Sequence, residues 1–169
     1  MHITRRRTRQ IQVGTVKIGG DAPISVQSMC STDTRDVEAT VEQIRQLEAV
    51  GCELIRVAVP DEEAAAALPR IKAAMTVPLI ADIHFDYRLA VSAARVVDCV
   101  RINPGNIGGA ARVREVVRAA RAHGLPIRVG VNSGSLEPDL LRRFGGATPE
   151  ALVASALRHV RLLERAGKG

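Results

Sequence analysis

Three arginines lie in short apolar runs of this sequence, where an isolated charge is unexpected. Arg56 stands inside LIRVAV, Arg101 inside CVRIN and Arg128 inside IRVGV. A guanidinium is always charged and costly to bury alone, so each of them needs a carboxylate or a bound anion. Together they predict an anionic ligand; for Arg56, a structural ion pair with Asp82 is the alternative.

An acid and a base lie two residues apart in ADIHFDY. Asp82 and His84 flank Ile83, and side chains two apart in a strand face the same side of a sheet. This spacing suits substrate positioning, proton transfer or a hydrogen bond within the core. No metal site is predicted, because one Asp with one His lacks a third ligand.

Two asparagines follow arginines in the later runs. Asn103 comes two residues after Arg101, and Asn132 four residues after Arg128, so each pair is expected to share a strand face. Glycines follow both asparagines, and glycine loops before a helix can bind phosphate through backbone N–H groups. Such loops are also common as plain turns. No catalytic residue is assigned from these patterns.

These residues need a framework that brings them together, and the sequence indicates repeated strand–helix units. In parallel folds of this kind, ligands bind at the carboxyl ends of the strands, where the polar residues fall. Alternating residues before the first unit predict a short hairpin over Gln10–Ile18. The predicted strands are Ile24–Met29, Glu53–Val59, Leu79–Ile83, Cys99–Ile102 and Ile127–Val131.

A helical pattern follows each strand. Asp33 or Thr34 is expected to cap the first helix, and Pro69 to kink or break the second. A helical turn is expected near Pro138–Phe144, and Thr148-Pro149 marks the start of the last helix. The other two predicted helices are Asp86–Val97 and Ala111–Ala122.

The units predict an α/β fold of the TIM (β/α)8 type, represented by about five of eight units. A complete barrel takes about 250 residues, and this chain has 169. A doubly wound sheet is the alternative, but no strand is followed by the glycine fingerprint of a dinucleotide site. We predict one partial domain over residues 1–169, with an arm and hairpin in 1–20 and the units in 21–169.

Composition narrows the function classes. The formal net charge is +6, but aromatic residues make up 2% of the chain, which argues against the base stacking of single-stranded nucleic-acid binding. The three cysteines are too few and scattered for a disulfide framework. No long apolar stretch or signal pattern is evident. We therefore expect a cytoplasmic protein with no nucleic-acid or membrane partner.

Five ordered motifs resemble a known family. VQSMCSTDTRD, ELIRVAVP, LIADIHFDYRLA, VRINPGNIG and RVGVNSGSL are similar to the amino-terminal barrel of 4-hydroxy-3-methylbut-2-enyl diphosphate synthase, an iron–sulfur oxidoreductase of non-mevalonate isoprenoid (terpenoid) biosynthesis. The family reductively opens 2-C-methyl-D-erythritol 2,4-cyclodiphosphate. The resemblance implies that the three arginines bind the diphosphate. It also implies that Asp82, His84, Asn103 and Asn132 position the ring and its hydroxyls, with Gln27 a weaker addition.

The resemblance also implies groups that this sequence does not supply. The family uses a 4Fe-4S cluster bound by cysteines of a carboxyl-terminal domain, electrons from ferredoxin or flavodoxin, and a homodimer. This chain has no C-x-x-C pair for such a cluster. We therefore expect the cluster-binding domain to be absent from this chain and the chain alone to be inactive. A dihydropteroate synthase-like barrel and a non-catalytic binding or assembly remnant are the alternatives.

Overall fold

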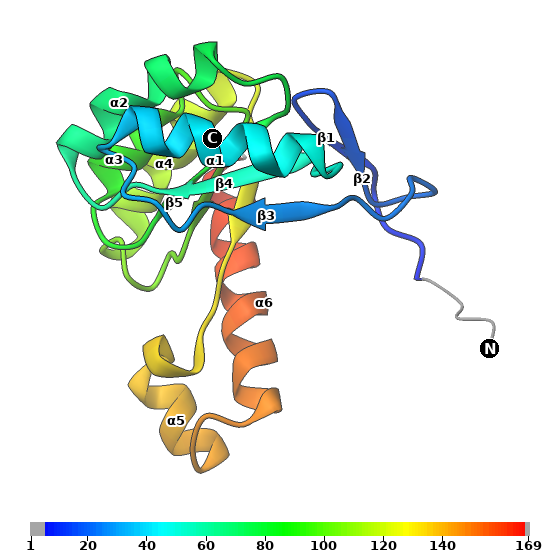
Figure 1. The fold of residues 1–169 in the computed structure, drawn as a ribbon. Helices are drawn as coiled ribbons and strands as arrows, with labels where there is room; N and C mark the ends of the chain where they lie inside the picture. The colour runs from blue at the N-terminus through cyan, green and yellow to red at the C-terminus, as the bar shows by residue number, and fades with distance from the viewer. Residues whose placement is uncertain (1–5, 168–169) are drawn as a thin grey trace.

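The structure is a computed structural model that describes residues 6–167, and its centre is a parallel β-sheet (Figure 1). Strands adjacent in sequence are adjacent in the sheet, in the order β3-β4-β5-β6-β7, and β1 pairs with β2 in a separate antiparallel hairpin. The strands are β1 (Ile11–Val13), β2 (Val16–Ile18), β3 (Gln27–Met29), β4 (Leu54–Ala58), β5 (Leu79–Ile83), β6 (Cys99–Ile102) and β7 (Ile127–Val129).

Helices follow the strands as the sequence predicts, and side chains cap several of them. Asp61 and Asp86 accept backbone hydrogen bonds at the starts of α2 and α3, and Thr148 does so at α6. The alternation of strands and helices confirms the predicted α/β barrel-type fold, and the pairing of β1 with β2 confirms the predicted hairpin. The helices are α1 (Val37–Ala49), α2 (Glu62–Ala73), α3 (Tyr87–Ala93), α4 (Gly109–Ala122), α5 (Pro138–Phe144) and α6 (Pro149–Ala166), with a short 3₁₀ helix η1 (Ser133–Ser135).

The outer face of the sheet forms the main core with the helices. Alternate strand residues such as Ile55, Leu79 and Val100 are fully buried against helical residues such as Leu68 and Ile71. These aliphatic side chains provide the packing that a sheet with few aromatics requires. The first four helices therefore lie together on one side of the sheet, as Figure 1 shows.

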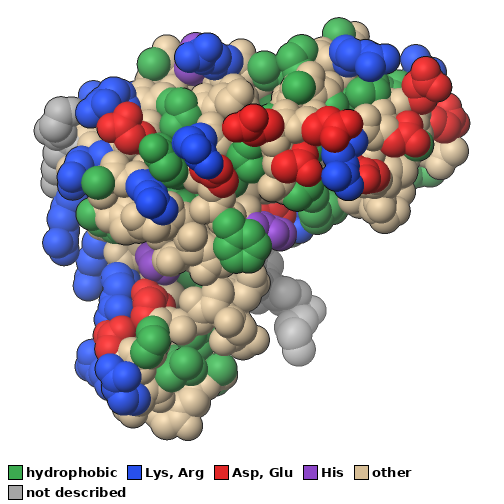
Figure 2. Space-filling view, turned by 90° about the vertical axis from the view of Figure 1, so that its left-hand side faces the viewer, with side chains coloured by type: hydrophobic (Ala, Val, Ile, Leu, Met, Phe, Trp, Pro, Cys, Tyr) green, Lys and Arg blue, Asp and Glu red, His purple; other side chains and the backbone are tan. Residues whose placement is uncertain are grey.

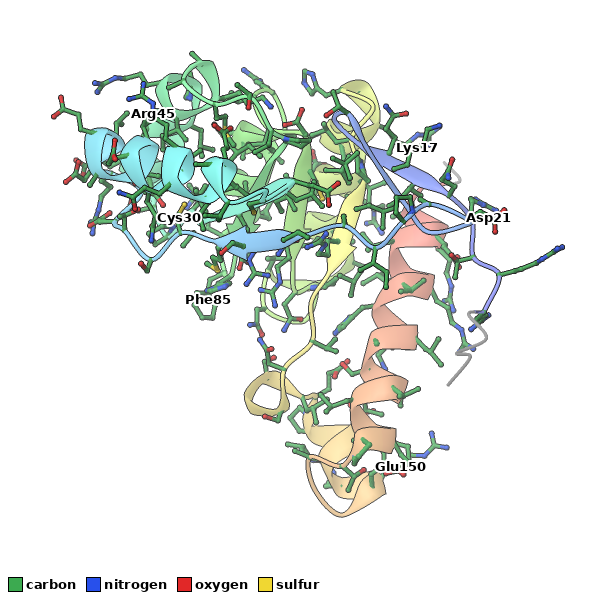
Figure 3. The ribbon with its side chains drawn as sticks, turned by 45° about the vertical axis from the view of Figure 1, so that its right-hand side comes forward. Lys17, Asp21, Cys30, Arg45, Phe85 and Glu150 are labelled. Atoms are coloured by element: carbon green, nitrogen blue, oxygen red, sulfur yellow. The ribbon has the colours of Figure 1, made fainter. Side chains whose placement is uncertain are left out.

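The inner face of the sheet is closed at its amino-terminal end by the hairpin. Leu54, Ile80 and Cys99 lie on this face of neighbouring strands and pack with Val13 of β1. All four side chains are almost completely buried. Figure 3 shows Lys17 and Asp21 at the hairpin end of the molecule and Cys30 and Phe85 beyond the opposite end of β3. Because the hairpin covers the amino-terminal end of this face, the end that stays open to a ligand is the one at the carboxyl ends of the strands.

The chain after β7 forms a lobe beyond the carboxyl ends of the strands. The 3₁₀ turn η1, helix α5 and the first half of α6 extend downward in Figure 1, and the rest of α6 packs on α4 and β7. The predicted turn at Pro138–Phe144 is confirmed as α5. The described residues contain no helix long and apolar enough to cross a bilayer.

Several predicted boundaries were wrong. Asp36, not Asp33 or Thr34, caps α1 through a bond from Ala39 N. Helix α2 passes through Pro69 without a break, although an interior proline costs about 3 kcal/mol. Pro69 is exposed, and its neighbours Leu68 and Ile71 are fully buried, which provides packing that opposes this cost.

Three strands are shorter than predicted because their neighbours determine where pairing begins and stops. Strand β4 lacks the predicted end residues Glu53 and Val59. Strand β3 begins at Gln27, and the predicted residues Ile24 and Val26 before it are exposed. Strand β7 pairs with β6 only as far as Val129. Asn132 therefore lies in a loop, and the prediction that it shares a strand face with Arg128 is wrong. Residues 1–5 and 168–169 of the predicted domain lie outside the described range.

Candidate functional site

A polar layer lies on the inner face of the sheet, two residues beyond the apolar layer that the hairpin covers. Arg56, Asp82 and Arg101 follow Leu54, Ile80 and Cys99 by two positions each, so they share the inner face. Asp82 is in register with Arg101, and Arg101 with Arg128. Asp82, Arg101 and Arg128 thus lie at one level, and Arg56, which is in register with Ile80, approaches Asp82 from one step before it on the same face.

Asp82 is the centre of this layer. Its side chain is only 3% exposed, and Oδ1 accepts a hydrogen bond from Arg101 Nη1 at 2.9 Å. Oδ2 lies 3.4 Å from Arg56 Nε, and Oδ1 lies 3.3 Å from His84 Nε2. The predicted ion pair of Arg56 with Asp82 is therefore present, and three arginines against one carboxylate leave a positive excess. His84, with a half-exposed side chain, forms the edge of the layer.

Arg128, and Arg56 in addition to its contact with Asp82, have neutral side chains as hydrogen-bond partners. Arg56 donates from Nε and Nη2 to Met29 Sδ at 3.1 and 3.0 Å, and Arg128 Nη1 donates to Gln27 Oε1. Both acceptors lie on β3, the strand that pairs with β4. Because a thioether and an amide carry no net charge, they orient the guanidinium groups without neutralising them. The layer is thus suited to bind an anion.

The two predicted asparagines lie on adjacent loops above this layer. Asn103 is buried; its Nδ2 donates to Ser135 Oγ at 2.8 Å, and its Oδ1 accepts from Gly105 N at 3.1 Å. Ser135 Oγ in turn donates to the carbonyl oxygen of Asn132 at 3.3 Å. Asn132 itself is exposed. The β6 loop and the loop after β7 are therefore linked directly.

Sequence reasoning missed Gly130, which makes room for Arg101. A Cβ atom added to Gly130 would overlap the Arg101 guanidinium. The position lies two residues after Arg128, so it shares the inner face of β7. The sequence does show a glycine two residues after an arginine in a predicted strand, but this pattern does not predict that the glycine lies against Arg101.

A second group missed from the sequence lies behind the asparagines. His159 of α6 and Glu137, the residue before α5, approach each other at 3.4 Å, and Ser155 Oγ donates to Glu137 Oε2 at 2.7 Å. The His159 ring lies against Gly105. Burial lowers the pKa of His159, with Glu137 opposing the shift. Glu137 and His159 are 22 positions apart, one in a loop and the other in a helix, so the sequence pattern did not predict their contact.

A family model described as the GcpE TIM-barrel domain matches residues 8–168. The chain belongs to the GcpE TIM-barrel family. The resemblance expected from the five motifs is confirmed.

Curated relatives of this GcpE domain carry one name. The 4-hydroxy-3-methylbut-2-en-1-yl diphosphate synthases (flavodoxin) of Chromohalobacter salexigens and Azotobacter vinelandii are 62% and 63% identical over 164 residues, which is 96% of this chain and 44% of each relative. That of Nitratidesulfovibrio vulgaris is 61% identical over 97% of this chain and 43% of its own length. The chain thus spans less than half the length of the curated relatives it matches.

Solved structures support the fold of this GcpE domain at low sequence identity. A dihydropteroate synthase of Xanthomonas albilineans, solved with 4-aminobenzoic acid, matches 94% of this chain and 62% of its own with 15% identity and a TM-score of 0.61. A DAHP synthase of Thermotoga maritima matches 94% of this chain and 43% of its own, with 16% identity and a TM-score of 0.56. At such identities the likeness shows the fold alone.

The cysteines of the GcpE domain do not fit an iron–sulfur cluster. Cys30 and Cys52 pack in the outer core, whereas Cys99 lies on the inner face of the sheet. Burial raises the pKa of Cys30 and of Cys99 to about 11, so both thiols are protonated at neutral pH. Within residues 6–167, no three His, Cys, Asp or Glu side chains are grouped as metal ligands. A cluster would need thiolates from outside these residues.

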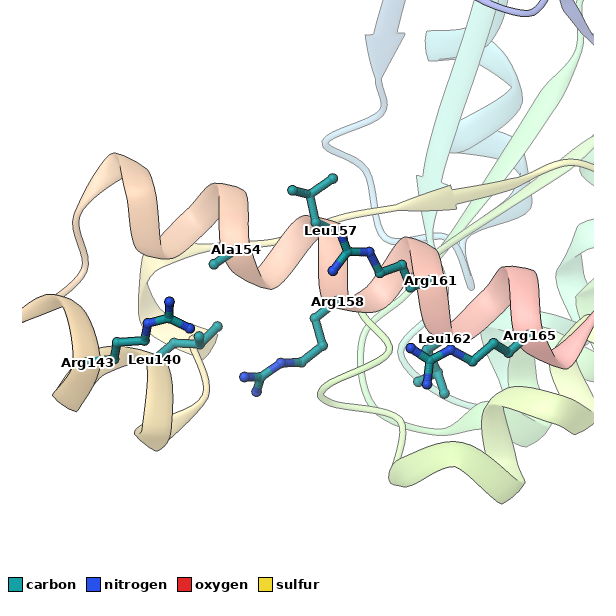
Figure 4. Close-up of a pocket in the computed structure, with 8 residues that line it drawn as sticks. All are labelled: Leu140, Arg143, Ala154, Leu157, Arg158, Arg161, Leu162 and Arg165. Atoms are coloured by element: carbon teal, nitrogen blue, oxygen red, sulfur yellow. The ribbon is translucent and has the colours of Figure 1, made fainter.

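A separate basic feature lies on the outside of the GcpE domain. A surface groove of about 550 Å³ lies along α6 and α5. Figure 4 shows the residues that line it, and Figure 2 shows Lys and Arg side chains along one side of this lobe. Arg158 there pairs with Asp139 at 2.6 Å. No member of the polar layer lines this groove. Its lining residues are Leu140, Arg143, Ala154, Leu157, Arg158, Arg161, Leu162 and Arg165.

Proposed function

We propose that this chain is the substrate-binding barrel of an enzyme that reductively converts 2-C-methyl-D-erythritol 2,4-cyclodiphosphate to 4-hydroxy-3-methylbut-2-enyl diphosphate. The observation that carries the proposal is the polar layer at the carboxyl ends of parallel strands, in which Arg56 and Arg101 contact Asp82 and Arg128 lies in register with Arg101. Family membership and the relatives' names give the chemistry of the ligand.

The arginines have the roles expected for a diphosphate. Arg56, Arg101 and Arg128 bind its oxygens, and the positive excess over Asp82 favours a ligand with more than one negative charge. Asp82 keeps Arg101 and Arg56 oriented when the ligand is absent. A sheet with its apolar end closed by the hairpin presents these groups at one end only.

The remaining predicted residues act on the rest of the ligand. His84, at the exposed edge of the layer, and Asn103 and Asn132, on the loops above it, position the ring and its hydroxyls, together with Asp82. No proton-transfer role is assigned to any of them. Gln27 orients Arg128 and contacts the ligand only through that arginine.

The reduction itself requires components beyond these residues. We propose that a 4Fe-4S cluster bound by another domain supplies the electrons, that flavodoxin or ferredoxin reduces it, and that the complete enzyme is a cytoplasmic homodimer. The cysteines described above do not fit such a cluster. This chain therefore contributes binding and orientation, and it is expected to be inactive by itself.

Calorimetric titration of the whole 169-residue chain with inorganic pyrophosphate and with the cyclic diphosphate tests the proposal. Arg56→Ala is expected to weaken both ligands by roughly 10- to 150-fold, because a charge-assisted hydrogen bond contributes about 1.5 to 3 kcal/mol. Arg88→Ala, which removes an exposed arginine paired with Asp86, is the matched control. Equal affinity of wild type and a folded Arg56→Ala variant would exclude Arg56 as a ligand.

A further inference from the structure

The Glu137–His159 pair is buried in a way that simple packing does not explain. His159 is 4% exposed, and neither ring nitrogen has a hydrogen-bond partner in the described part of the chain. Glu137 Oε1 is also buried without a hydrogen bond, and it lies 3.4 Å from His159 Nε2. A buried polar group without a partner is destabilising, so such a pair needs a reason at this position.

The surroundings of the pair connect it to both asparagine loops. On one side, the His159 ring lies against the β6 loop; a Cβ added to Gly105 would be 3.3 Å from both His159 Nε2 and Asn103 Oδ1. On the other side, Glu137 ends the loop that begins at Asn132, and Ser155 and Arg158 of α6 contact its carboxylate. Helix α6 therefore contacts the β6 loop through His159 and the loop that ends at Glu137 through Ser155 and Arg158.

The two loops also contact each other directly. Asn103 Nδ2 donates to Ser135 Oγ, and the backbone of Gly105 donates to Asn103 Oδ1. Backbone hydrogen bonds from Asn106 and Ile107 to the Asn103 carbonyl oxygen hold the turn from within, and the His159 ring packs against its Gly105. Removal of that ring opens space beside Gly105, so the direction of the Asn103 amide is expected to depend on His159.

We propose that His159 and Glu137 are positioning residues of the candidate site, which fix the Asn103–Gly105 turn against the Asn132–Glu137 loop so that both asparagines face one ligand. This inference rests on the proposed function for the identity of the ligand. It assigns neither residue a contact with substrate. Their role is to preorganise the part of the site that recognises the ring and hydroxyls, while the arginine layer recognises phosphate.

This division of roles gives a test by ligand choice. His159→Leu is expected to weaken binding of the cyclic diphosphate about tenfold, the effect of one misaligned hydrogen bond, and to leave inorganic pyrophosphate binding unchanged. His159→Gln retains a donor that can reach Glu137 Oε1, so it should restore most of the lost affinity. Arg161→Ala, an exposed change on the same helix, is the control.

A measurement without ligand separates the inference from the proposed function. In ¹⁵N NMR spectra, the Asn103 side-chain amide should shift and exchange faster in His159→Leu, and remain as in wild type in His159→Gln and Arg161→Ala. Wild type that binds neither ligand, with this NMR pattern intact, would overturn the proposed function and support the positioning role. An unchanged Asn103 signal in His159→Leu, or equal loss of both ligands, would overturn the positioning role.

Discussion

The two ends of the inner sheet face are built by the same strands, yet they differ completely in chemistry. At the hairpin end, Leu54, Ile80 and Cys99 form an apolar layer. Two residues further along each strand, Arg56, Asp82 and Arg101 form a charged layer. Alternate side chains of a strand share a face, so residues two positions apart on one strand can lie in the apolar layer and in the charged, ligand-binding layer, respectively. The closed end stabilises the framework on which the open end is preorganised.

The largest expected effect is the loss of Asp82. Asp82→Ala leaves Arg101, whose side chain is 11% exposed, buried without a carboxylate. Breaking a buried ion pair on one side typically costs about 3 to 5 kcal/mol, and the free energy of unfolding in urea measures it. Asp139→Ala removes an exposed partner of Arg158 and should cost much less. Similar stability losses in the two variants would mean that the charged layer is not a buried network.

A substitution in the apolar layer should lower the stability of the chain without changing its affinity for pyrophosphate. Ile80→Ala removes a fully buried side chain beneath the hairpin, which typically costs about 2 to 5 kcal/mol. Pyrophosphate affinity of the folded variant should equal that of wild type, because the charged layer is unchanged. Ile24→Ala, at a residue that is 81% exposed, is the control and should be nearly neutral. Loss of affinity in Ile80→Ala would show that the two layers are not independent.

Gly130→Ala tests the charged layer by volume instead of charge. The added methyl group overlaps the Arg101 guanidinium, so we expect a cost of about 1 to 3 kcal/mol and weaker pyrophosphate binding. Gly134→Ala places its methyl group where no atom lies within 4 Å. Thermal unfolding and calorimetric titration of the two variants give the comparison. Unchanged binding by Gly130→Ala would indicate that Arg101 relocates without consequence.

The smallest effect concerns pH. Burial lowers the pKa of His159 in the folded chain, so the unfolded chain binds its proton first as pH falls. Stability from this group is thus present above the ordinary pKa of 6.5 and is lost as pH falls through it, by at most about 1.4 kcal/mol per pH unit. Glu137 and Arg158 are the charged groups that influence it. Urea unfolding between pH 7.5 and 5.5 should show a smaller slope in His159→Gln; equal slopes would contradict this.

Local patterns predicted much of the fold and part of the site. Alternating and helical periodicity located every strand and helix of the barrel, and Thr148-Pro149 marked α6 correctly. A charge in an apolar strand needs a partner, so an ion pair of Arg56 with Asp82 was the alternative to ligand binding, and this pair is present. Boundaries were predicted less well, since the fifth strand was expected to reach Val131 and Asn132 to share a strand face with Arg128, whereas β7 ends at Val129. Where a strand ends depends on its neighbour, and one segment does not contain that information.

Residue types and a spacing of two were sufficient to determine an α/β barrel-type fold and a cationic, strand-end site in this chain, because strand geometry places alternate residues on one face. The five motifs were sufficient to determine the family. Only the tertiary structure decided that Met29 and Gln27 orient two arginines, that Gly130 admits a third, and that Glu137 meets His159 behind Asn103. These contacts join segments far apart in the chain, and their geometry arises only when the sheet and α6 have packed.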